Sequence, residues 1–342
     1  MTEIYLIRHG QAEGNVFRRI HGQYDSLLTP TGILQAKCVE KRFQDIRIDG
    51  CFSSDLTRTS LTARSIYVPK NLRLRRDPRF REVNLGVWED LPFGYLDAFQ
   101  PERMHAFNHN PPKWHVTGGE TYPEYTSRFI EGMVDAAKEF DGGTVAIFGH
   151  GAVIRGTLMR LFFDDDCDKL PYCDNTGVCK LIYDRGRFSY EFVNDNSHIP
   201  HELSTFATQS WWRKTGDRSE VNLYYVPYAD SLELPADLPL PEMDSRGVTL
   251  AAILGQKAVA LVSMAAPEGD LGRILGMSLR ADLEGRDYGE QLLGAAFSHF
   301  RHLGCKSIAV NPGYYPDDIV RKYEFDLVTN ARNIDPKIYQ WG

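Results

Sequence analysis

The chain of 342 residues is longer than one hydrophobic core usually fills, so two domains are expected. Its 42% hydrophobic and 25% charged residues are typical of a soluble globular protein, and no apolar run approaches the length of a membrane span. A formal net charge of −7 argues against nucleic acid or an anionic membrane surface as the main partner.

The start of the chain and its cysteines indicate the expected compartment. Met1-Thr2-Glu3 lacks the basic start and apolar core of a signal peptide, so the cytoplasm is expected. The cysteines form no Cys-x-x-Cys pair, and the six-residue spacing of Cys167, Cys173 and Cys179 fits no common zinc site. We therefore expect free thiols and no bound metal.

The first predicted element is a buried strand over residues 4–7, where four apolar residues follow one another. The apolar run stops at Arg8-His9-Gly10, so the strand ends in a cation and an imidazole. Open α/β sheets bind their ligands at the carboxyl ends of strands. A polar loop that contains Gln11 and Asn15 follows and could line such a site.

Two helices and a second strand are expected next. Thr29 suits the N-cap and Pro30 the first position of a helix that runs to about residue 43. A short strand over 51–54 precedes a helix that opens at Asp55. Arg58 would lie in the first turn of that helix, where backbone N–H groups also favour anions.

Residues 91–120 are rich in proline, histidine and aromatic residues, and we expect a long lid or substrate loop rather than a packed element. A helix is expected from about 123 to 140. The expected buried strand 144–148 is followed by Gly149-His150-Gly151, so it ends in a His-Gly pair as the first strand does. A helix over 152–163 and a hairpin over 178–193 complete this unit.

The composition becomes polar from residue 194 to 220, and this segment contains Trp211-Trp212, which we expect at a domain interface. We divide the chain into a first domain (1–200), a connector (201–219) and a second domain (220–342). The elements expected in the second domain are paired strands over 249–254 and 258–264, a strand over 273–279, an amphipathic helix over 289–303 and a strand over 306–310.

Two strands that end in His-Gly, with two arginines near strand ends, fit phosphoryl transfer. Two guanidinium groups can hold phosphoryl oxygens by bidentate hydrogen bonds. A neutral imidazole can attack phosphorus and become a phosphohistidine, and a second histidine can donate to the transferring oxygens. A carboxylic acid must then protonate the leaving oxygen. Each residue taken singly is more often structural, so the joint pattern carries the inference.

Residues 1–200 resemble the histidine phosphatase superfamily, which has a three-layer α/β, phosphoglycerate mutase-like fold. The motifs that carry the resemblance are Arg8-His9-Gly10, Asn15, Gly22–Asp25, Leu28–Gly32 with Gln35-Ala36, Ser53–Arg58, Glu82 with Gly86–Glu89, Gly118–Thr121, and Gly149–Gly151. The sequence departs from the family pattern at two positions, with Asp90 in place of a common glycine and Thr121 in place of the commoner serine.

The resemblance implies a role for each motif residue. The implied nucleophile is His9, Arg8, Arg58 and His150 complete the phosphate pocket, and Glu82 is the proton donor. The implied substrate-binding residues are Gln11, Asn15 and Gly22.

Segment 53–63 resembles the small-molecule phosphatase branch of the family, which includes α-ribazole phosphatase. The expected activity is metal-independent hydrolysis of a small phosphorylated metabolite, with no cofactor. Two alternatives stay open for this domain. One is a phosphoglycerate mutase, and the other is a non-catalytic binding protein on the same fold.

In the second domain, a glycine-containing loop over 284–293 lies between a predicted strand and a predicted helix. Such a loop can bind pyrophosphate through backbone N–H groups. It resembles the GNAT N-acetyltransferases, as does segment 319–325, and this implies a smaller mixed α+β domain. The resemblance also implies acetyl-CoA bound near Gly285 and Gly289, and hence a bifunctional phosphatase and acetyltransferase.

The departures from that family pattern argue against the cofactor. They are Asp287 for glycine, Glu284 for glutamine or arginine, Val320 for tyrosine and Glu324 for glycine. Residues 221–342 also carry 16 acidic against 11 basic side chains, and this net negative charge disfavours the binding of a polyanionic cofactor. The alternative is a non-catalytic domain that binds a partner or shields the phosphatase site. Three tyrosines could still supply a proton donor: Tyr314, Tyr315 and Tyr323.

Overall fold

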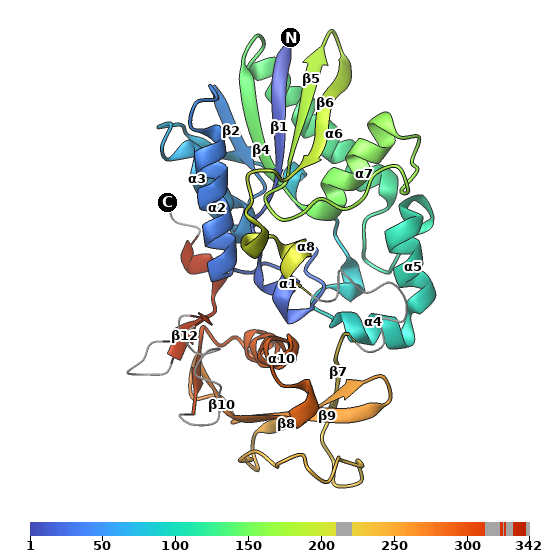
Figure 1. Ribbon diagram of the computed structural model, residues 1–342, viewed down its shortest axis with the longest axis vertical. Coiled ribbons are helices and arrows are strands. Elements are labelled where there is room, and N and C mark those ends of the chain that lie inside the picture. Colours follow the sequence, from blue (N-terminus) through green and yellow to red (C-terminus); the bar gives the residue numbers. More distant parts are fainter. Residues whose placement is uncertain (210–220, 312–321, 324, 326–330, 340–342) are drawn as a thin grey trace.

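The computed structural model describes residues 1–209, 221–311, 322–323, 325 and 331–339, and it places one six-stranded sheet above another (Figure 1). The predicted Trp211-Trp212 contact lies outside the described residues. Within them, no helix combines the length and apolar character needed to cross a bilayer.

The first sheet has the order β3-β2-β4-β1-β5-β6. Its strands are β1 (Thr2–Arg8), β2 (Gly50–Ser53), β3 (Leu74–Arg76), β4 (Thr144–Gly149), β5 (Val178–Asp184) and β6 (Arg187–Asp195). Strands β1 to β4 are parallel, and the hairpin β5–β6 adds an antiparallel edge. The register pairs Arg8 with Gly149, so the residues that follow both strands, His9 and His150, start from the same edge of the sheet.

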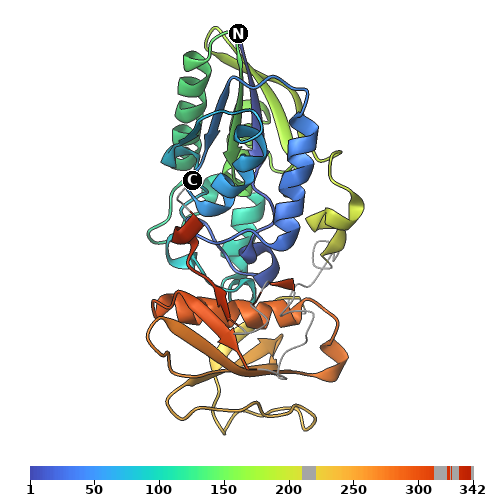
Figure 2. The ribbon, with the colours of Figure 1, turned by 90° about the vertical axis from the view of Figure 1, so that its left-hand side faces the viewer.

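Helices cover both faces of this sheet, as Figure 2 shows. Alternation along β1 explains the layers, because successive side chains of a strand point to opposite faces. Ile4 and Leu6 pack with residues of α6 (Tyr122–Glu139) and α7 (Gly151–Phe162). Tyr5 and Ile7 pack with residues of α2 (Pro30–Phe43) and α3 (Thr57–Tyr67). The predicted three-layer α/β domain is confirmed.

The prediction of a loop over residues 91–120 is wrong. The segment contains α4 (Phe93–Phe99), α5 (Pro101–His109) and a short 3-10 helix (Pro111–Lys113). Leu96, Met104 and Trp114 are buried in the main core, and the Trp88 and Trp114 rings lie 5.4 Å apart. Several of the aromatic residues that suggested a ligand loop instead fill this core.

The second sheet has the order β12-β11-β10-β9-β8-β7. Its strands are β7 (Tyr224–Pro227), β8 (Val248–Leu254), β9 (Lys257–Met264), β10 (Leu271–Leu279), β11 (Ser307–Val310) and β12 (Ala331–Asn333). Among the described strands of this sheet, β10 and β11 alone pair in parallel, and α10 (Tyr288–His302) joins them. The predicted strands and helix are present, and the short edge strands β7 and β12 were missed.

The remaining elements are short. They are α1 (Glu13–Phe17), α8 (Thr205–Thr208) and 3-10 helices at Pro78–Phe80, Gly86–Trp88, His201–Leu203, Ala281–Leu283 and Pro336–Tyr339. In Figures 1 and 2, α1 lies at the end of the first domain directly against α10.

Candidate active site

The two histidines that follow β1 and β4 face each other across the sheet edge. Their ring centroids lie 5.2 Å apart. Nδ1 of His9 lies 2.6 Å from the carbonyl oxygen of Gly10, and a carbonyl can only accept. Nδ1 therefore carries the proton, and a neutral His9 has its lone pair on Nε2. This is the tautomer that a nucleophilic histidine needs.

Both imidazoles are held in the neutral form. Burial, with Arg58 and Arg8 nearby, holds the pKa of His9 well below its usual value. Burial and Arg58 also hold the pKa of His150 well below 6.5. His150 is fully buried, and neither ring nitrogen has a hydrogen-bond partner among the described residues. A buried polar group without a partner is costly, which is consistent with a role in binding a ligand.

Two arginines flank His9. Arg8 donates from Nη1 to the carbonyl oxygen of Cys173 at 2.5 Å, and its buried Nε has no partner in the described part of the chain. Arg58 is only 1% exposed and donates to the carbonyl oxygens of Gly22 (2.6 Å) and Tyr24 (3.0 Å). The backbone of Gly22 thus orients Arg58, and Gly22 also lines the cavity that contains both arginines, where the family resemblance implies a substrate contact.

Glu82 lies against the first turn of α7. Its Oε1 accepts from the backbone N–H groups of Val83 (3.0 Å) and Val153 (2.7 Å), and its Oε2 accepts from Ala152 (3.0 Å). Three backbone donors fix the orientation of the carboxyl group. It lines the same cavity as His9, Arg8 and Arg58, so the residues that the family resemblance implies as proton donor and nucleophile share one space.

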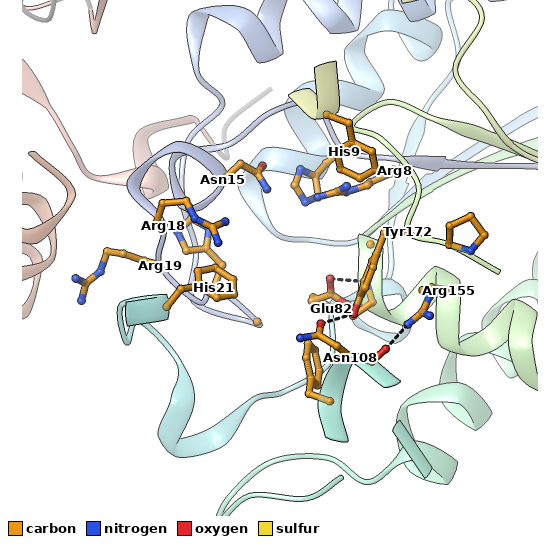
Figure 3. Close-up of a pocket in the computed structure, with 18 of the residues that line it drawn as sticks. Arg8, His9, Asn15, Arg18, Arg19, His21, Glu82, Asn108, Arg155 and Tyr172 are labelled. Atoms are coloured by element: carbon orange, nitrogen blue, oxygen red, sulfur yellow. Dashed lines mark hydrogen bonds between the residues drawn. The ribbon is translucent and has the colours of Figure 1, made fainter. Parts of the chain in front are cut away.

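This cavity has a volume of about 600 Å³, far more than a phosphoryl group fills. In Figure 3, Arg18 and His21 lie on one side of it, and Tyr172 and Arg155 lie on the other. Four aromatic side chains line the cavity: Phe93, Phe107, Tyr172 and Phe206.

The sequence analysis missed this aromatic wall and its polar supports. Arg155 donates to three backbone carbonyls, those of Leu170 (2.8 Å), Cys167 (2.9 Å) and Asn108 (3.1 Å). The hydroxyl of Tyr172 donates to the Asn108 side chain at 3.1 Å. The aromatic composition of residues 91–120 was a signal for the Phe93 and Phe107 part of the wall, although most of that segment packs elsewhere.

The structure separates Asn15 from Gln11. Asn15 lines the cavity, and its Oδ1 accepts from the backbone N–H of Ala12 at 2.9 Å, which leaves its amide N–H groups to donate. Gln11 does not line it. Its Oε1 accepts from Thr29 at 2.8 Å, and its Nε2 donates to Thr205 at 3.2 Å, so its side chain ties the loop to α2 and α8.

The predicted cofactor loop precedes α10. Gly285 is exposed with φ +70°, Gly289 is in the first helical turn, and Asp287 precedes the helix. Burial and the nearby Glu290 raise the pKa of Asp287, which lines a small cavity of about 210 Å³ with Glu290 and Lys322. Glu290 pairs with Lys322 at 2.6 Å. Two carboxylates here disfavour a polyanion.

The tyrosines proposed as proton donors are only partly described. Tyr323 is buried, with its ring 5.5 Å from that of Phe17, so it packs in the core of the second domain. Tyr314, Tyr315, Val320 and Glu324 lie outside the described residues. Within the described ranges, no cluster of three or more histidine, cysteine, aspartate or glutamate side chains has the arrangement of a metal site.

Comparison with known proteins relates the first domain to one family. The sequence profile of the histidine phosphatase superfamily (branch 1) matches residues 4–196. A protein described as probable phosphoglycerate mutase GpmB, from Yersinia pestis, is 34% identical over 162 residues, which is 47% of this chain and 75% of that protein.

Solved structures agree with this relationship. YhfR of Bacillus stearothermophilus is 30% identical with a TM-score of 0.55, over 58% of this chain and all of that chain. A mycobacterial glucosyl-3-phosphoglycerate phosphatase in complex with VO3 is 25% identical with a TM-score of 0.53, over 57% of this chain and 99% of that chain. None of these matches is to an acetyltransferase.

Proposed function

Because the chain belongs to the histidine phosphatase superfamily, we propose that it hydrolyses a small phosphomonoester through a phosphohistidine at His9. The observation that supports this most is the hydrogen bond from Nδ1 of His9 to Gly10, which leaves the lone pair on Nε2 beside two arginines. A histidine kept neutral by its surroundings is a nucleophile throughout the neutral pH range.

The proposed reaction has two steps. In the first, the Nε2 lone pair of His9 forms a bond to phosphorus while the ester P–O bond breaks, and the carboxyl group of Glu82 gives its proton to the leaving oxygen. In the second, water attacks the phosphohistidine, Glu82 takes a proton back, and phosphate and His9 are released. Arg8, Arg58 and His150 stabilise the charge on the equatorial oxygens.

The test is hydrolysis of p-nitrophenyl phosphate by the purified full chain, followed by a screen of phosphorylated metabolites. We expect turnover that EDTA does not diminish, because guanidinium groups supply the positive charge that holds the phosphoryl group. Turnover that chelation abolishes would contradict this mechanism. Complete inactivity on every phosphomonoester would favour a binding protein on the same fold.

Phosphoglycerate mutase is the second candidate, and the name of the Yersinia relative favours it. A mutase must return the phosphoryl group from the histidine to a second hydroxyl before water intervenes. Isomerisation of phosphoglycerate that clearly exceeds its hydrolysis would replace the phosphatase proposal by a mutase.

For the second domain, acetyl-CoA binding and acetyltransferase activity stay predictions from sequence resemblance, and with them the bifunctional alternative. We propose weak or no binding of acetyl-CoA, because Asp287 and Glu290 place two carboxylates at the start of α10. Isothermal titration of the full chain tests this. Micromolar binding would support a working acetyltransferase.

A further inference from the structure

Helix α1 is part of the first domain and also packs into the core of the second. Asn15 lines the active-site cavity, whereas the next two residues, Val16 and Phe17, are buried in the hydrophobic core of the second domain. The Phe17 ring lies 5.2 Å from that of Phe297 on α10. A Cβ atom at Gly294 would lie 2.4 Å from Cβ of Phe17, so α10 approaches α1 too closely for any side chain there.

A buried charge fixes the start of α1 to the second domain. Glu13 is fully buried, and its carboxylate accepts from Arg301 at 2.8 Å and from Arg332 at 3.3 Å. Both arginines come from the second domain, one on α10 and one on β12. The same carboxylate accepts from the backbone N–H of Leu27 at 3.2 Å, so it also closes the loop that contains α1.

A second anchor joins the two domains at Asp90. This residue has φ +60°, a conformation that glycine adopts with least strain, and it stands where the family commonly has glycine. Its carboxylate accepts from Arg19 at 2.7 Å and from Ser298 on α10 at 2.5 Å. The Arg19 side chain points away from the cavity (Figure 3) and also donates to Ser298 at 2.8 Å.

A third contact between the domains involves Arg18, whose side chain lines the cavity. Arg18 lies over the Phe93 ring, 4.3 Å from its centroid, and donates from Nε to Asn222 at 2.8 Å. Asn222 in turn donates to Asp97 in α4 at 2.6 Å. It lies at the start of the second domain, so a residue outside the phosphatase fold orients an arginine in the wall of the phosphatase site.

We propose that the second domain is a positioning element of the active site, which holds α1 so that Asn15 and Arg18 face the substrate. The proposal rests on the proposed phosphatase function of the same site. Arg301 is the positioning residue that we single out, since it does not line the cavity itself and pairs with Glu13 at the start of α1. The alternative of an independent second domain predicts no effect of Arg301 on phosphatase kinetics.

The expected effect is on KM more than on kcat. Asn15 and Arg18 can contact the bound ester, and their position depends on the second domain. The reacting groups have their own supports within the first domain: Gly10 accepts from His9, and Val83, Ala152 and Val153 donate to Glu82. A displaced α1 should therefore weaken substrate binding while the groups that break the ester bond stay in place.

The experiment measures p-nitrophenyl phosphate hydrolysis by full-chain variants. For Arg301→Gln we expect KM to rise about tenfold, the value of one hydrogen bond to a charged group, and kcat to stay within about threefold. Arg301→Lys should restore part of the loss, because lysine can still pair with Glu13. The control is Arg280→Gln, which breaks a surface pair with Asp282 in the same domain and should leave both constants unchanged.

A double-mutant cycle decides whether Arg301 acts through Glu13. If it does, Glu13→Gln with Arg301→Gln should raise KM no more than the larger single effect, whereas independent effects multiply. A wild-type KM in Arg301→Gln, or multiplying effects in the cycle, would overturn the proposal. If Arg301→Gln does not fold, Ser298→Ala tests the second anchor, at Asp90 and Arg19: KM should rise while kcat stays within about threefold, and a wild-type KM would overturn the proposal. An inactive wild-type chain would instead refute the phosphatase function itself.

Discussion

Acid should destabilise this protein through its buried active-site histidines. His9 and His150 are 7% and 0% exposed, and burial lowers the pKa of both well below the 6.5 of an unfolded chain. As pH falls through 6.5, the unfolded state binds protons that the folded state does not, so stability present at higher pH is lost. His198, whose pKa burial lowers to about 4, acts in the same direction.

The magnitude follows from linkage. One unit below the unfolded pKa, each histidine that stays neutral in the folded state costs about 1.4 kcal/mol, so His9 and His150 together cost about 3 kcal/mol at pH 5.5 relative to pH 7.5. Carboxylates with lowered pKa values contribute mainly below this window, so comparison with a histidine variant, rather than the window alone, assigns the loss to a histidine. A loss of this size is a large fraction of the about 5–15 kcal/mol that stabilises a typical fold.

The assay is urea unfolding at pH 7.5, 6.5 and 5.5. His150→Gln should lose about 1.4 kcal/mol less than the wild type over this range, whatever its stability at pH 7.5. The matched control is His115→Gln, because His115 is exposed and should leave the pH dependence unchanged. Equal pH dependence in His150→Gln and the wild type would refute the claim that His150 is neutral and inaccessible to protons in the folded state.

Three further predictions concern single side chains. His9→Ala should lower kcat by a factor on the order of 10⁵ and abolish the phosphohistidine seen by acid-quench labelling, while vanadate still binds weakly through Arg8 in a titration; wild-type turnover would refute the mechanism. Glu82→Gln should slow alkyl phosphates by about 10²–10⁴-fold and p-nitrophenyl phosphate much less, because nitrophenolate hardly needs a proton; equal losses would assign Glu82 to positioning. Asp287→Gly should strengthen any acetyl-CoA binding by up to about a hundredfold in isothermal titration, and unchanged micromolar binding would show that the carboxylate does not face the cofactor.

Much of the first domain could be predicted because strong local signals coincide with it. The apolar runs of β1 and β4 end in the same His-Gly pair, and Thr29-Pro30 marks the start of α2 where the structure has it. The segment 91–120 failed because composition cannot tell an aromatic ring that fills a core from one that lines a cavity. Edge strands β7 and β12 are too short for periodicity to identify them.

The interface between the domains could not be derived from the sequence, although two signals of it were present. The Asp90 departure from the family motif and the apolar pair Val16-Phe17 in a polar loop both mark contacts with α10. Their partners lie about two hundred or more residues later, and a single sequence does not say which distant elements meet. The hydrogen bonds that join Gln11 to Thr205 on α8 and Arg58 to the backbone of Gly22 could not be derived for the same reason.

The position of β1 in the middle of its sheet has a consequence for synthesis of the chain. Leu6 pairs with Ile147 on one side and Cys179 on the other, so this strand is translated long before either neighbour exists. Pairings between such distant segments form slowly, and until they form the apolar strand is open to aggregation and to chaperones. The nascent chain thus carries Arg8 and His9 at the end of an unsupported strand, and the pocket is assembled only after most of the protein has left the ribosome.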